Sequence, residues 1–129
     1  MPGKYENVSL DDFVEYSKSM FEYWTEDDFA SSFRKMLTIE QFRSEEMQGL
    51  YQQYLSSGPA AYVKDLFESM GIAHAEENAV RFYATMYFYY SVYDGADDKE
   101  KVKNEFASAI GSMAQEWIKQ PKLTQIRKS

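Results

Sequence analysis

Hydrophobic residues recur every three or four positions along most of this chain, and the period-two alternation of a half-buried strand is absent. Such spacing places the apolar side chains on one side of each helix, because successive helical residues are about 100° apart. The pattern predicts an all-α protein in which four shorter helices precede two long ones. We expect the helices at about residues 10–23, 26–42, 45–55, 59–70, 76–93 and 98–119.

Short polar residues mark several of the expected helix starts. Ser9, Thr25 and Asp97 each have an acidic residue three positions later, as in a capping box, and Ser44 precedes another helix. Pro59 suits the first position of the fourth helix, where an N–H group has no partner within the helix. In the second helix the expected apolar stripe is formed by Phe29, Phe33, Met36 and Leu37.

The expected helix at 76–93 has aromatic residues on most of its sides. One face is formed by Ala79, Phe82, Tyr83, Met86, Tyr90 and Tyr93, and a second by Val80, Ala84, Tyr87 and Phe88. A helix that is apolar most of the way round must be covered on most of its surface. Arg81, Thr85 and Ser91 interrupt it too often for a membrane span, which needs about 20 mostly apolar residues. We therefore expect one face to pack inside the domain and the other against a second copy of the chain.

The last expected helix carries two stripes that differ in side-chain size. The large side chains are Val102, Phe106, Ile110, Met113 and Trp117, and the neighbouring, mostly small ones are Ala107, Gly111, Ala114 and Ile118. Small residues let a partner backbone approach closely. We predict a dimer interface made by Ala84, Tyr87, Phe88, Ala107, Gly111, Ala114 and Ile118. The alternative is that both stripes form one wide core face within a single chain.

Length and composition fit a single helical domain spanning residues 1–129, with an ordered part at about 10–119 and looser ends at 1–8 and 120–129. The absence of cysteine excludes disulfides and thiolate metal sites and favours a cytoplasmic location, and no apolar leader or membrane segment is visible. The formal net charge is −7, although Lys119, Lys122, Arg127 and Lys128 make the end of the chain basic. An acidic body argues against direct DNA binding by this domain.

The chain offers little for catalysis or metal binding. His74 and Glu76 match the start of a zinc-deaminase signature, but the cysteine pair that signature requires is missing. The acidic residues between Asp94 and Glu100 lack the spacing of a calcium loop, and turn or cap chemistry explains them better. We predict no catalytic residue, no metal site and no cofactor, and hence no enzyme.

The content of aromatic residues and methionine is the one unusual feature of the composition. Nine Phe, eleven Tyr, two Trp and seven Met make 29 of the 129 residues. Tyrosines among phenylalanines supply apolar walls with a few hydroxyl groups, and methionine adapts to different shapes, as in a site for a small hydrophobic molecule. The predicted walls are Trp24, Phe33, Leu37, Tyr51, Phe67, Tyr83 and Met86. The alternative is that these residues simply fill the core.

Two segments resemble the regulatory domain of TetR-type transcriptional regulators. They are Trp24 to Glu46, with the sequence WTEDDFASSFRKMLTIEQFRSEE, and the run AVRFYA at Ala79 to Ala84 with the later Tyr93-Asp94-Gly95. With the number of helices, the resemblance covers about Leu10 to Lys119.

The resemblance implies a homodimer in which the last two helices pair with their twins as a four-helix bundle. It also implies a cavity among the earlier helices that binds a small hydrophobic or aromatic effector. The family's helix-turn-helix headpiece, which contacts DNA, is absent from this sequence, so we expect either the C-terminal part of a longer protein or a relative without a headpiece. The competing hypothesis is a ligand-free helical module that binds another protein.

Overall fold

The computed structural model describes residues 9–119, and all regular structure in that range is helical. The predicted all-α class is thus confirmed. The helices are α1 (Leu10–Glu26), α2 (Asp28–Glu40), α3 (Glu45–Leu55), α4 (Ser57–Ser69), α5 (Ala75–Gly95) and α6 (Lys99–Lys119). The two ends expected to be loose, at 1–8 and 120–129, lie outside the described residues, as does most of the basic tail.

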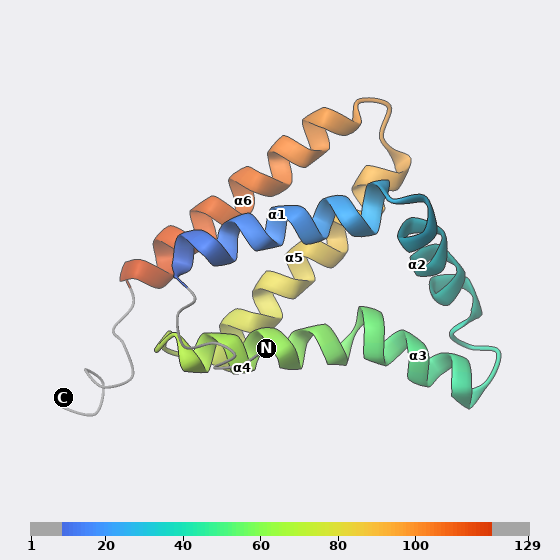
Figure 1. The fold of residues 1–129 in the computed structure, drawn as a ribbon, viewed down its shortest axis with the longest axis horizontal. Helices are drawn as coiled ribbons and strands as arrows, with labels where there is room; N and C mark the ends of the chain where they lie inside the picture. Colours follow the sequence, from blue (N-terminus) through green and yellow to red (C-terminus); the bar gives the residue numbers. More distant parts are fainter. Residues whose placement is uncertain (1–8, 120–129) are drawn as a thin grey trace.

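The helices form an arrangement in which α1 lies along the closing hairpin (Figure 1). Helices α5 and α6 run in opposite directions and are joined by residues 96–98, and α1 contacts both of them. Helix α4 packs on α5, while α2 connects the end of α1 to α3. Helix α5 is consequently in contact with α1, α4 and α6.

Local capping explains where most helices begin. The Ser9 hydroxyl accepts a hydrogen bond from the Asp12 N–H at 3.0 Å, and the Ser44 hydroxyl accepts one from the Met47 N–H at 3.2 Å, as predicted. The cap expected at Thr25 is wrong, because α1 continues through it and its buried hydroxyl donates to the Phe21 carbonyl at 2.7 Å. Asp27 caps α2 instead and accepts from the Ala30 N–H.

Two further boundaries differ from the prediction. Helix α4 begins at Ser57, so Pro59 is its third residue and the break from α3 is only Ser56. A proline is tolerated there because the first four N–H groups of a helix have no partner within it. At the start of α6, the Lys101 N–H donates to Asp98, one residue later than the expected cap.

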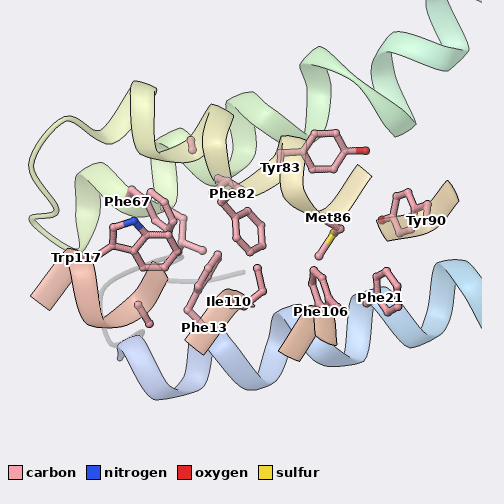
Figure 2. Close-up of a cluster of buried hydrophobic side chains, with 14 of the residues drawn as sticks. Phe13, Phe21, Phe67, Phe82, Tyr83, Met86, Tyr90, Phe106, Ile110 and Trp117 are labelled. Atoms are coloured by element: carbon pink, nitrogen blue, oxygen red, sulfur yellow. The ribbon is translucent and has the colours of Figure 1, made fainter. Parts of the chain in front are cut away.

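The core is one hydrophobic cluster, rich in aromatic rings, that is contributed by α1, α4, α5 and α6 (Figure 2). Phe21 of α1 stacks on Phe106 of α6 with ring centroids 4.3 Å apart and on Tyr90 of α5 at 5.7 Å. Nearer the start of α1, the ring of Phe13 meets the ring of Phe67 of α4 edge to face, with ring centroids 5.1 Å apart. A smaller buried cluster is formed by Leu37, Tyr51 and Leu55.

A group of charges fixes α6 against α1. The ammonium group of Lys103 lies 2.9 Å from Glu26, 3.1 Å from Glu22 and 3.1 Å from Glu100. Hydrogen bonds that the Lys103 ammonium donates to the Glu26 and Glu22 carboxylates raise the pKa of Lys103, so the side chain is charged at neutral pH.

Candidate ligand cavity and apolar outer face

A half-open cavity of about 250 Å³ lies between α1, the α3–α4 junction and α5, with the exposed Tyr16 and Tyr54 among its lining residues. Its walls come from four helices, and most of them are rings or other apolar side chains. The lining residues are Phe13, Tyr16, Ser17, Met20, Trp24, Gln53, Tyr54, Gly58, Pro59, Tyr62, Val63, Phe82, Tyr83, Met86 and Tyr90. None of these side chains is a carboxylate, an ammonium, a guanidinium or an imidazole.

Helical spacing brings the walls together. In α1, Phe13, Ser17, Met20 and Trp24 follow each other at intervals of three or four and therefore share one side of the helix. The α3–α4 junction forms one wall of the cavity, and at Gly58 the backbone of α4 lies close to the backbone of α3. A Cβ atom there would lie 2.2 Å from the Gln53 carbonyl oxygen, so only glycine fits without moving the backbone.

Three of the hydroxyl-bearing residues that line the cavity are buried, namely Ser17, Tyr83 and Tyr90. Ser17 donates to the Phe13 carbonyl at 2.8 Å, and Tyr83 donates to the Leu55 carbonyl at 2.5 Å. Burial raises the pKa of Tyr83 and the pKa of Tyr90, so both phenols are protonated and neutral at ordinary pH. The cavity is therefore an uncharged, largely aromatic space with phenol groups in its wall.

Arg34 of α2 contacts two residues that line this cavity, Trp24 and Tyr90. Its guanidinium forms a two-pronged ion pair with Asp94 at 3.0 and 2.8 Å, donates to the Trp24 carbonyl at 3.0 Å, and lies 4.9 Å above the Tyr90 ring. The side chain is 6% exposed. One residue thus ties the ends of α1 and α5 to α2 and fixes two cavity walls.

Sequence reasoning did not identify Arg34. The local sequence does indicate that Arg34 is buried, because it lies four residues after Ala30 and three before Leu37 and so shares their side of α2. Its partner Asp94 is 60 residues away in the sequence, and no local pattern connects the two.

Three of the seven predicted wall residues, Trp24, Tyr83 and Met86, do line the cavity. The other four, Phe33, Leu37, Tyr51 and Phe67, do not. Leu37 and Tyr51 belong to the small second cluster, where Phe33 packs on them, and Phe67 is enclosed in the main core beside Phe13 and Trp117. Composition alone misled here, since core and wall residues are of the same types. The larger contribution of α1, from Phe13, Tyr16 and Met20, was missed for the same reason.

A second, wider depression of about 530 Å³ lies on the outer side of α5, against the α3–α4 junction. Tyr51 and Tyr87 meet there through a hydrogen bond between their hydroxyl groups. Burial raises the pKa of Tyr51 to about 12. Tyr83 lines both the inner cavity and the outer depression.

The predicted interface residues fall into three groups. Ala84, Phe88 and Ile118 are exposed, with Phe88 at 60% and Ile118 at 63%, while Tyr87, Ala107 and Gly111 are half-buried. A Cβ atom on Gly111 would meet nothing within 4 Å. Ala114 differs from the prediction because it is 5% exposed and belongs to the core of its own chain. The predicted interface is thus apolar and open at Ala84, Phe88 and Ile118, whereas Ala107 borders a depression beside Lys18, Phe21 and Glu22 of α1 in its own chain.

The expected apolar stripe of α2 is largely exposed. Leu37 is buried, but Phe29 and Met36 are exposed and Phe33 is half-buried. Ile39 near the end of α2 and Phe42 just beyond it are 76% and 85% exposed, and with Phe29 and Met36 they form an apolar outer surface. The side of α2 that carries Ala30, Arg34 and Leu37 faces inward, which leaves Phe29 and Met36 on the exposed side.

No protein-family model matches the chain, and no curated protein and no solved structure matches it. The resemblance to TetR-type regulators therefore depends on the sequence segments quoted above. Within residues 9–119, no helix has the length and hydropathy to cross a bilayer, and no three His, Asp or Glu side chains come together as metal ligands.

Proposed function

We propose that this chain is the effector-binding and homodimerisation domain of a TetR-type transcriptional regulator, a repressor that senses a small hydrophobic or aromatic molecule. The observation that carries the proposal is the two-sided character of α5. On its inner side, Phe82, Met86 and Tyr90 line an uncharged cavity. On its outer side, Val80 and Phe88 are exposed to solvent in the single chain.

The two sides of α5 supply the coupling that a sensor needs. A ligand in the cavity touches the same helix whose outer face contacts the second copy in the proposed dimer. Occupancy then favours one position of α5 and one arrangement of the two subunits, a coupling that in such systems amounts to about 1–3 kcal/mol. DNA contact is assigned to a helix-turn-helix headpiece outside this sequence. A reading frame that encodes such a basic headpiece upstream of Met1 would support the assignment.

Gly111→Glu tests the dimer. The half-buried Gly111 has open space around it in the single chain, so the fold accepts a larger side chain, whereas a charge placed against a partner helix costs several kcal/mol. We expect dimers for the parent and monomers for the variant in sedimentation or light scattering. Gly49→Glu is the matched control, because Gly49 also lies in a helix with nothing within 4 Å of an added Cβ. A variant at Gly111 with the mass of the parent dimer would contradict the proposed interface.

The competing function is a ligand-free module that binds another protein. The exposed Phe29, Ile39 and Phe42 at α2 favour it, because such side chains are typical of interaction surfaces. A broad screen of hydrophobic compounds by thermal shift separates the two functions. A sensor is stabilised by some of them through mass action, whereas the interaction module shows no response.

A further inference from the structure

Tyr90 carries a hydroxyl group that the fold does not use. The residue is 3% exposed and lines the cavity, and within residues 9–119 its hydroxyl makes no hydrogen bond. Every fully enclosed side-chain nitrogen or oxygen in the described part of the chain has a hydrogen-bond partner, so the Tyr90 oxygen keeps some accessible surface, and the cavity is a space that its residue lines. Buried polar groups are normally paired, and an unpaired one that faces a cavity is suited to a bound molecule.

The surroundings of Tyr90 hold its ring in place. Phe21 stacks on it at 5.7 Å with an interplanar angle of 13°, and the Arg34 guanidinium lies 4.9 Å from its centre. Figure 2 shows the ring at the same end of the core as Phe21 and Met86. Burial keeps the phenol protonated by raising its pKa, so the donor is present at neutral pH.

Size and charge limit what can occupy the space. The cavity measures about 250 Å³, whereas a dry cavity of about 150 Å³ is enough to hold benzene. The space is therefore suited to two fused rings. No cationic side chain lines it and Arg34 is neutralised by Asp94, so an anionic ligand would lose its hydration without compensation.

We propose that the cavity binds a neutral bicyclic aromatic molecule carrying a hydrogen-bond acceptor, and that the Tyr90 hydroxyl donates to this acceptor. The proposal rests on the proposed sensing function and specifies its ligand class. Specificity arises because a ligand without the acceptor leaves the Tyr90 hydroxyl unpaired, whereas a matching one satisfies it.

The test uses two probes of nearly equal shape, quinoline and naphthalene, of which only quinoline has an acceptor nitrogen. Protein labelled with ¹³C in the methionine methyl groups is titrated with each probe and followed by NMR. Met20 and Met86 line the cavity and should shift through the ring currents of the bound probe. Met36 and Met47 lie outside the lining and serve as internal controls.

The decisive variant is Tyr90→Phe, which keeps the ring between Phe21 and Arg34 and removes only the hydroxyl. We expect it to weaken quinoline binding about 5- to 10-fold, the effect of one hydrogen bond, and to change naphthalene binding by less than about 2-fold. Tyr89→Phe is the matched control, since Tyr89 neighbours Tyr90 in α5 but does not line the cavity, and it should change neither affinity. The anionic 2-naphthoate should bind at least about tenfold more weakly than naphthalene.

The outcomes separate the two proposals. Equal effects of Tyr90→Phe on both probes, or no loss for quinoline, would overturn the role of Tyr90 while leaving the cavity as a ligand site. Tighter binding of 2-naphthoate than of naphthalene would overturn the neutral ligand class. If neither neutral probe shifts Met20 or Met86 in the parent protein, the sensing function fails and this inference fails with it.

Discussion

The inner and outer sides of α5 are built from the same kinds of residue, yet the fold treats them differently. Phe82 and Met86 are buried in the core, whereas Val80 and Phe88, a few positions away, face outward. The inner side is covered by α1, α4 and α6, whereas Phe88 on the outer side is 60% exposed among the described residues. Hydrophobic composition thus shows that a surface needs covering, and the fold shows which surface the chain covers itself.

The largest expected effect is the loss of stability when a ring on the inner side of α5 is truncated, compared with a ring on the outer side. Phe82→Ala should lower the free energy of unfolding by about 3–5 kcal/mol, because it leaves a cavity among packed rings. Phe88→Ala should leave the unfolding free energy of the monomer within about 0.5 kcal/mol and weaken self-association instead. Urea unfolding at low protein concentration measures the first quantity and sedimentation measures the second. Equal destabilisation of the monomer by both variants would show that the two sides are not distinct.

The next largest effect concerns the end of α5, where the buried group is the charged guanidinium of Arg34 rather than an aromatic ring. Asp94→Ala leaves the Arg34 guanidinium without its partner and should cost about 2–3 kcal/mol. This is less than for a fully enclosed pair, because Asp94 is 28% exposed. Glu40→Ala removes one member of an exposed pair with Arg43 and should cost less than about 0.5 kcal/mol. A similar cost for both would mean that Arg34 is better solvated than its burial indicates.

The smallest effect concerns Tyr83, which lines both the inner cavity and the outer depression. Tyr83→Phe should cost about 1–2 kcal/mol, because the Leu55 carbonyl loses its donor.

The same residue contributes to the pH dependence of stability. Burial raises the pKa of Tyr83, Tyr90 and Tyr51, the last to about 12, so the folded state favours the protonated phenols. Their contribution to stability is fully present below about pH 10, the unfolded value, and is lost as the pH rises above it toward the folded values. Denaturant unfolding between neutral and strongly alkaline pH should show this loss. Tyr83→Phe should reduce its slope, and an unchanged slope would contradict the assignment.

Much of the fold was predictable because its causes are local. Helical periodicity identified the helices, and side-chain caps at Ser9 and Ser44 fixed two of their starts. The inner face of α5 was predicted in full, since all six of its residues are buried. Where capping choices competed, as between Thr25 and Asp27, the prediction was wrong by a few residues. Either side chain can accept a hydrogen bond at a helix start, so only the course of the backbone decides.

The candidate site was less predictable because its causes are distant in the sequence. Of the expected walls, Trp24, Tyr83 and Met86 line the cavity, but nothing in the sequence distinguishes them from Phe67, which fills the core. The sequence by itself determined an all-helical chain with an aromatic, two-sided hairpin, since periodicity and side-chain size act within each helix. Only the tertiary structure decided that Arg34 is buried against Asp94, that the phenylalanines of α2 point outward, and that Tyr90 keeps an unused hydroxyl beside a cavity. Those outcomes depend on how the helices meet, and helix contacts join residues that are many positions apart.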